Sequence, residues 1–159
     1  MEITQRAFDA LTPTELYDVA RLRQDVFVVE QACPYPDLDG RDTEPTAVHV
    51  LLHLGDGAER HLAGCARVLV DEVPEKEGAA GPVWRIGRIA LVRSARGQGL
   101  STPLMEGALR VCAAAVERDV VLDAQSPLVG FYAGFGFAPD GPEFLEDGIP
   151  HTPMRRQAG

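Results

Sequence analysis

The sequence predicts a mixed α/β fold built on a single sheet, and three observations support this prediction. Short apolar runs of strand length alternate with segments of helical period along the 159 residues. A strong helix-start signal stands at Thr12. From Trp84 to Met105, an apolar strand ends in a basic, glycine-rich turn that leads into a helix. The length and a hydrophobic fraction of 45% suit one core, so we expect residues 1–159 to form one domain.

The N-terminal part of the chain is expected to hold a strand, a helix and a long loop. Ile3 to Phe8 has the length of a short strand. Thr12-Pro13-Thr14-Glu15 reads as a capping box with proline at the first helical position. We expect that helix to stop near Val26–Val29, where β-branched residues cluster. Ala32 to Pro45 is rich in proline, glycine and acidic residues, which predicts a loop.

The middle of the chain predicts a hairpin followed by the central strand. Val48 to Val70 contains two alternating apolar runs separated by Gly-Asp-Gly, which indicates an antiparallel hairpin in which alternate residues are less buried. Asp71 to Pro82 is polar and is expected to be a loop. The strand that contains Trp84 then leads to the glycine turn, and a helix is expected to start at about Gly99.

The C-terminal part of the sequence predicts a second parallel strand, followed by a short helix and two terminal strands. Val120 to Gln125 is a short apolar run, Pro127 to Gly134 can form a short helix, and two strands separated by an acidic loop are expected to follow. If the Trp84 and Val120 strands pair in parallel through the intervening helix, the glycine turn lies at a carboxyl edge of the sheet. Ligands bind at such edges in α/β proteins.

The glycine turn predicts an anion site. Gly97 and Gly99 let backbone N–H groups face outward, and a helix N-terminus presents unpaired amides. The stretch carries four arginines and no acidic residue in a chain of formal net charge -9, namely Arg85, Arg88, Arg93 and Arg96. Local basicity in an acidic protein favours an anionic ligand. The alternative is a surface loop before an ordinary helix.

Several other functions are disfavoured by the residues. The turn lacks the Gly-Lys-Ser/Thr of a P-loop, and a GxGxxG dinucleotide fingerprint fails where Thr102 replaces the third glycine. No metal site is predicted, because the three cysteines and four histidines show no ligand spacing and the acidic loop does not match an EF-hand. The negative net charge disfavours nucleic acid. No leader and no apolar run of about 20 residues is present, so we expect a cytoplasmic protein with no membrane partner.

The glycine turn also carries a family resemblance. Arg96-Gly97-Gln98-Gly99-Leu100-Ser101 resembles the Arg/Gln-x-x-Gly-x-Gly/Ala motif of GNAT acetyltransferases, with Ser101 as its one departure. A longer pattern resembles the ElaA-like branch of that superfamily. It runs through Leu22–Tyr35, His49, Ile86–Arg88, Ala124–Gln125, Phe131–Phe137, Glu146–His151 and Met154.

The resemblance implies a V-shaped sheet whose central parallel strands splay to admit the pantetheine arm of acetyl-CoA. It implies an N-acetyltransferase that transfers the acetyl group directly to a primary amine of a small molecule or peptide, without a metal. Backbone groups of Ile89, Ala90 and Leu91 would hold the pantetheine and polarise the acetyl carbonyl. The pyrophosphate would bind at the turn, formed by Arg96, Gly97, Gln98, Gly99, Leu100, Ser101 and Thr102, chiefly through the amides of Gln98 to Thr102.

Three residues are implied in proton transfer. Tyr132 matches the tyrosine that donates a proton to the departing thiolate, and its alternative role is an aromatic residue of the core. The central strand carries no carboxylate, so the resemblance leaves Glu30 and His151, a residue of the late loop, as candidates for the general base. Glu30 could instead be a salt-bridged carboxylate at a helix end, and His151 a histidine bonded to backbone.

Two functional alternatives stay open. One is a non-catalytic acyl-CoA-binding or sensing module, and the other is an acyltransferase with a longer acyl donor, as in autoinducer synthases. Asp37, Asp39, Asp42 and Glu44 could form an acidic mouth for a cationic amine or simply a solvated loop. The sequence does not decide the assembly state, for which a homodimer is one option.

Overall fold

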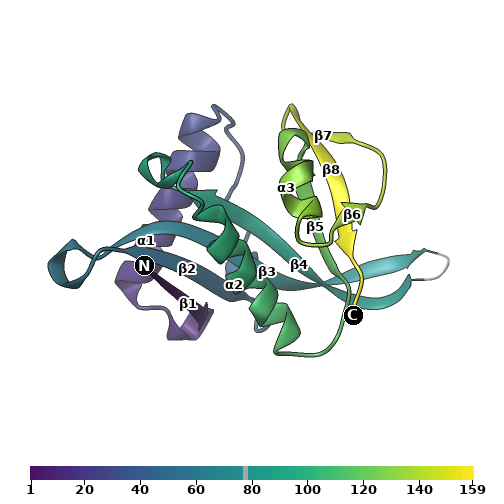
Figure 1. Ribbon diagram of the computed structural model, residues 1–159, viewed down its shortest axis with the longest axis horizontal. Coiled ribbons are helices and arrows are strands. Elements are labelled where there is room, and N and C mark those ends of the chain that lie inside the picture. The colour runs from purple at the N-terminus through teal and green to yellow at the C-terminus, as the bar shows by residue number, and fades with distance from the viewer. Residues whose placement is uncertain (77–78) are drawn as a thin grey trace.

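The fold is organised around one mixed sheet, shown in the computed structural model of Figure 1, which describes residues 1–76 and 79–159. Within these residues the strand order is β1-β2-β3-β4-β5-β8-β6, and β7 also pairs with β8. The strands are β1 (Glu2–Ala7), β2 (Val48–Leu54), β3 (His61–Lys76), β4 (Ala79–Leu91), β5 (Val120–Gln125), β6 (Ala138–Pro139), β7 (Phe144–Glu146) and β8 (Ile149–Arg156). The helices are α1 (Pro13–Arg23), which continues as a π-helix (Gln24–Glu30), α2 (Ser101–Ala113) and α3 (Val129–Ala133).

The first helix begins and ends close to where the sequence predicts. Thr12 Oγ1 accepts from the Glu15 amide at 3.1 Å, and the Thr12 amide donates to Glu15 Oε2 at 2.8 Å, which completes the capping box. Beyond Arg23 the helix widens into a π-helix that runs to Glu30, one residue past the expected stop near Val26–Val29. The β-branched residues Val26, Val28 and Val29, which lower α-helix propensity, lie in this widened segment.

The central parallel pair is confirmed, and it is short. β4 and β5 pair only at Trp84 with Val120 and at Arg85 with Val121. Beyond this point β4 bulges against β3, because the register shifts between Cys65 and Arg67. The two strands then diverge as the arms of a V, which Figure 1 shows between the α1 side and the α3 side. The sheet is thus open at the carboxyl ends of its two central strands.

The predicted loop over Asp71–Pro82 is wrong where the structure describes it. β3 extends to Lys76 and β4 begins at Ala79, with Glu72 opposite Pro82 and Asp71 opposite Val83. Residues 77 and 78 of that prediction lie outside the described residues. The polar composition of this segment suggests a loop. Pairing between two strands nevertheless satisfies the hydrogen bonds of the backbone N–H and C=O groups, whatever the polarity of the side chains.

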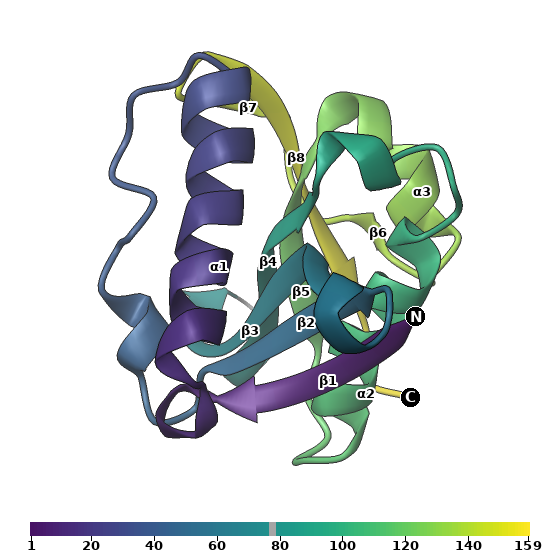
Figure 2. The same ribbon diagram turned by 90° about the vertical axis from the view of Figure 1, so that its left-hand side faces the viewer.

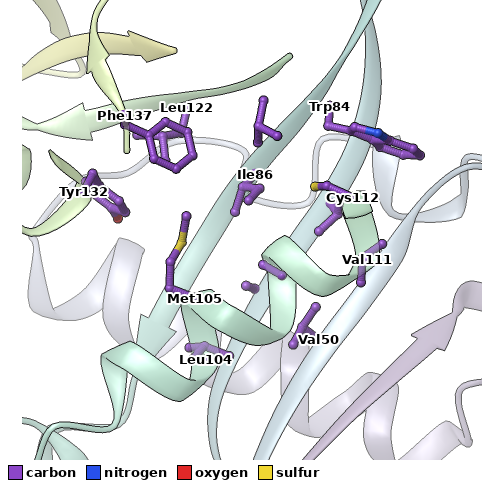
Figure 3. Packing of buried hydrophobic residues seen from close by; sticks show 14 of the residues in the cluster. Val50, Trp84, Ile86, Leu104, Met105, Val111, Cys112, Leu122, Tyr132 and Phe137 are labelled. Atoms are coloured by element: carbon purple, nitrogen blue, oxygen red, sulfur yellow. The ribbon is translucent and has the colours of Figure 1, made fainter. Parts of the chain in front are cut away.

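Helices cover both faces of the sheet, as Figure 2 shows for α1 on one side and α2 on the other. Leu51 packs with the α1 residues, whereas Val50 and Leu52 pack with α2. Residues expected to be less buried, including His49 and His53, are therefore buried as well. Figure 3 shows the α2 side of the core, where Leu104 and Met105 are fully buried against β2 and β4. No helix in residues 1–76 and 79–159 is long and apolar enough to cross a bilayer.

The C-terminal region contains three strands rather than the two expected. β8 pairs with the whole of β5, and β6 and β7 both pair with β8. The acidic loop is in fact a tight turn: Glu146 pairs with Ile149, and Asp147 and Gly148 between them have φ of 50° and 80°. Two positive φ values in a two-residue Asp-Gly connection are typical of a type I′ hairpin.

Candidate active site

A cavity of about 620 Å³ lies in the opening between β4 and β5. Its wall takes residues from both strands, from the π-helix and the segment after it, and from α3, β7 and β8. Arg96, Ile89, Tyr132 and His151 all reach this one cavity. The fold therefore brings together groups that the sequence places more than 60 residues apart.

The glycine turn lies at the end of β4, before α2. Gly97 and Gly99 have φ of 73° and 75°, a region that favours glycine. In the part of the chain that the structure describes, the amides from Gly97 to Ser101 have no hydrogen-bond acceptor, whereas the Thr102 amide donates to Gly99 O at 3.3 Å. An open row of amides at the N-terminus of a 13-residue helix fits a pyrophosphate group.

The side chains of this turn point back toward the protein. The guanidinium of Arg96 donates to Leu91 O at 3.0 and 3.1 Å and pairs with the Glu30 carboxylate. The side chain of Gln98 donates to Ser94 O at 2.6 Å. The side chains therefore shape the turn, and the backbone amides face outward.

The predicted pantetheine segment lies on the open edge of β4. Ala90 pairs with Cys65 and Leu91 with Gly64 on the β3 side. On the other side, the pairing with β5 has already ended at Arg85. Backbone groups near Ile89 consequently face the opening, where an extended ligand can take the place of a strand.

Tyr132 lies on α3, on the β5 side of the opening. The residue is 7% exposed, its ring packs edge-on against Phe131 and Phe137, and Figure 3 shows it beside Phe137. Burial raises the pKa of its hydroxyl to about 12. The side chain is both a core aromatic and a part of the cavity wall. At neutral pH it is a hydrogen-bond donor that keeps its proton.

His151 lies on β8 rather than in the expected loop, because the acidic turn ends sooner than predicted. The residue is 8% exposed and stacks on Phe144. Its Nδ1 is 2.8 Å from Ile149 O, and since a carbonyl only accepts, we assign the proton to Nδ1. The lone pair is then on Nε2, which lies 3.9 Å from Glu146 Oε2. This tautomer is the one a proton acceptor needs.

Glu30 is at the end of the π-helix, where it pairs with Arg96. The hydrogen bond from Arg96 lowers the pKa of the Glu30 carboxyl. Of the described residues, Arg96 lines the cavity and Glu30 does not. A carboxylate with a lowered pKa that already has a cationic partner is a weak proton acceptor.

The aspartates of the long loop form neither an acidic mouth nor a solvated loop. Asp37 and Asp42 are buried, and each carboxylate is paired with arginines from the helix and the sheet. The pairs join Asp37 to Arg23 and Arg88, Asp39 to Arg67 and Arg88, and Asp42 to Arg23 and Arg67. The sequence did carry a signal, because an arginine inside an apolar segment needs a buried partner.

A second ion-pair network crosses the sheet and contributes to the cavity wall. Asp71 of β3 pairs with Arg41 and with Arg85, and Arg85 also pairs with Asp123 of β5 at 2.7 Å. Arg41 further pairs with Glu44 at 2.7 Å. Three carboxylates thus share two guanidinium groups, which leaves this network with negative charge.

An opened pair of central parallel strands, with a glycine turn and a helix start beside the gap, defines a class of fold, that of the acyl-CoA N-acyltransferases. The crystal structure of an acyl-CoA N-acyltransferase from Pseudomonas aeruginosa matches with a TM-score of 0.83 at 38% identity, covering 98% of this chain and 99% of that one. The crystal structure of Escherichia coli ElaA matches with a TM-score of 0.83 at 34% identity and the same coverage.

Sequence comparisons agree with the fold. A family model described as an acetyltransferase (GNAT) domain matches residues 56–158. Protein ElaA of Escherichia coli (strain K12) is 37% identical over 148 residues, which cover 92% of this chain and 90% of that protein. A UPF0039 protein of Mycobacterium tuberculosis is 46% identical over 141 residues, covering 89% and 83%. The chain belongs to the GNAT acetyltransferase family, and within it to the ElaA-like branch, which confirms the predicted fold class and resemblance.

Within residues 1–76 and 79–159, no group of three His, Cys, Asp or Glu side chains is arranged to hold a metal ion. Cys33, Cys65 and Cys112 are free and buried, and Cys33 lines the cavity. Burial, with added repulsion from Asp147 and Glu146, raises the pKa of the Cys33 thiol. A thiol of that kind is a poor nucleophile at neutral pH.

Proposed function

We propose that the chain forms one domain that transfers the acetyl group of acetyl-CoA directly to a primary amine in the cytoplasm. One observation carries the proposal: a single cavity joins the open edge of β4 and the turn beside Arg96 to Tyr132 and His151. The donor would lie along β4, with its pyrophosphate on the amides of Gln98 to Ser101; the Thr102 amide of the expected set already donates to Gly99 O. The acceptor would enter from the side of β7 and β8.

His151 is the proposed base. An alkyl amine with a pKa of about 10.4 is almost entirely protonated at pH 7, so one proton must leave before attack. With its proton on Nδ1, His151 carries a free lone pair on Nε2 and lines the cavity, whereas the Glu30 carboxylate is paired with Arg96. The amine nitrogen then attacks the acetyl carbon, and a backbone N–H near Ile89 stabilises the negative charge on the oxygen.

Tyr132 would act on the leaving group. When the C–S bond breaks, the electron pair stays on the sulfur, and the Tyr132 hydroxyl donates a hydrogen bond to it. The pKa of the Tyr132 hydroxyl, raised to about 12, exceeds the value of about 8.5 for a thiol. The tyrosine therefore donates a hydrogen bond to the thiolate and keeps its proton at the end of the reaction. The protonated His151 or solvent then supplies the proton that completes the thiol, and the acetylated nitrogen releases its remaining extra proton to solvent, which leaves a neutral amide.

The test is calorimetric titration with acetyl-CoA, followed by thiol-release assays over a panel of amines with acetyl and longer acyl donors. Amine-dependent release that is fastest with acetyl-CoA is the expected result. Faster thiol release with a longer acyl-CoA would mean that the longer acyl group, and not the acetyl group, is the one transferred. Binding of acetyl-CoA without release from any amine would favour a sensing module, and an absence of binding would refute the assignment of the glycine turn.

A further inference from the structure

We propose that the acceptor is a primary amine with a second positive charge, of the aliphatic diamine type, and that Glu146 and Asp147 of the β7–β8 turn recognise it. The inference rests on the proposed transferase function and names the substrate class of the same site. It follows from which charges on the cavity wall already have partners.

Every arginine on the described cavity wall is paired with carboxylates, in the two networks above or in the pair between Arg96 and Glu30. Two carboxylates on that wall, those of Glu146 and Asp147, have no arginine or lysine partner among the described residues. Among the described residues, Glu146 has one ion-pair contact, with the His151 ring at 3.9 Å, and its side chain is 60% exposed. The charges on the described cavity wall that have no arginine partner are therefore the two negative charges of Glu146 and Asp147. A ligand with two positive charges would neutralise them.

The turn that carries these carboxylates is held against the opposite arm of the cavity. Asp147 has φ of 50°, and its carbonyl oxygen accepts from Cys33 Sγ at 3.8 Å, which ties the turn to the segment after the π-helix. Figure 2 shows the β7 end of the hairpin beside the upper end of the helix that begins as α1. The acidic turn is exposed to solvent and forms one side of the cavity wall.

His151 gives an independent indication that a ligand nitrogen binds here. The residue is nine-tenths buried and lines the cavity, its Nδ1 is satisfied by Ile149 O, and its Nε2 has no hydrogen-bond partner among the described residues. The 3.9 Å between Nε2 and Glu146 Oε2 is too long for a hydrogen bond. An amine nitrogen between them could donate to both. Glu146 would hold the reacting ammonium until His151 removes its proton, and Asp147 would hold the second one.

The experiment compares three acceptors that present the same reacting amine: 1,5-diaminopentane, 1-aminopentane and 5-aminopentanoate. With saturating acetyl-CoA, thiol release should give kcat/KM about tenfold or more higher for the diamine than for the monoamine, and lowest for the carboxylate. Asp147→Asn keeps a residue suited to positive φ and should raise KM for the diamine about tenfold. The ratio of kcat/KM for the diamine to that for the monoamine should therefore fall toward one.

Glu59→Gln is the matched control, because it removes the same charge from an exposed turn between β2 and β3. It should leave all three acceptors unchanged, and circular dichroism and acetyl-CoA affinity should show that each variant is folded. Calorimetric binding of the diamine to the CoA complex gives a second readout, which Asp147→Asn should weaken. Equal use of diamine and monoamine, or a preference for the carboxylate, would overturn this inference and leave the transferase proposal standing. An absence of turnover with every amine would overturn both.

Discussion

The buried ion cluster makes a sharp prediction about Arg23. This side chain is 2% exposed and donates to Asp37 Oδ2 at 2.8 Å, to Asp37 O at 2.8 Å and to Asp42 Oδ1 at 2.6 Å. Methionine has a similar length and no charge, so Arg23→Met removes three charge-assisted hydrogen bonds and keeps the buried volume. Removing one partner of a buried ion pair costs about 3–5 kcal/mol, because the other charge stays buried.

The structure sets the expected value near the lower end of that range. Asp37 keeps Arg88 at 2.9 Å and Asp42 keeps Arg67 at 3.0 Å, so neither carboxylate becomes unpaired. We expect the free energy of unfolding to fall by about 3 kcal/mol and the melting temperature by about 6–12 °C. Urea unfolding followed by circular dichroism measures the first quantity.

Arg21→Met is the matched control, two positions earlier on the same helix. Arg21 is 62% exposed and pairs with Asp18 at 3.3 Å, an exposed pair worth about 0.5 kcal/mol or less. A loss of less than about 1 kcal/mol for Arg23→Met would refute the reasoning, because the cluster would then behave as a set of surface pairs.

Three further predictions follow from single positions. Tyr132→Phe should lower kcat about 100-fold with unchanged acetyl-CoA affinity, and unchanged turnover would leave Tyr132 with a packing role only. Gly99→Ala should strain a residue with φ of 75° and weaken acetyl-CoA binding in calorimetry, whereas Gly57→Ala, at φ of 54° and equally open, should cost similar stability and leave binding unchanged. Burial lowers the pKa of His49, so the stability from keeping it neutral is present above about pH 6.5 and is lost as the pH falls below that value. Urea midpoints at pH 7.5 and 5 should differ less in His49→Gln, and an unchanged difference would exclude this histidine as the cause.

The parts of the fold that the sequence predicts are those with local causes. The capping box at Thr12 and the glycine turn before α2 follow from residues within one or two turns of each other. The strand Val120–Gln125 is found with the predicted bounds, because a short apolar run between polar segments leaves little choice of ends. Local signals fail at Asp71–Pro82, where a long partner strand decides the structure instead of composition.

The candidate site depends on contacts between residues that are far apart in the sequence, and local sequence patterns do not show these contacts. The resemblance supplied Tyr132 and His151 as residues, but only the packing of α3 and β8 on the far side of β5 brings them into one cavity. The pairing of Glu30 with Arg96 joins residues 66 positions apart, and the turn at Asp147 meets Cys33 across 114. These contacts form only when the chain is folded. An acidic stretch in the sequence therefore shows where negative charge lies, but it does not show which carboxylates have no arginine partner.

The ion cluster also explains how the opening in the sheet is maintained. Arg88 has φ of 52°, in a region that costs a non-glycine residue about 1–2 kcal/mol, and it lies where the register of β4 shifts against β3. Its guanidinium forms ion pairs with Asp37 and Asp39 and donates hydrogen bonds to Asp37 O and Asp39 Oδ2, each at 3.2 Å, and these contacts offset a cost of that size. The bulge lies three residues beyond Arg85, where pairing with β5 stops, so it turns β4 away from β5 as the cavity begins. A strained arginine is thus stabilised by the same aspartates that hold the long loop, and the loop, the bulge and the cavity depend on one set of charges.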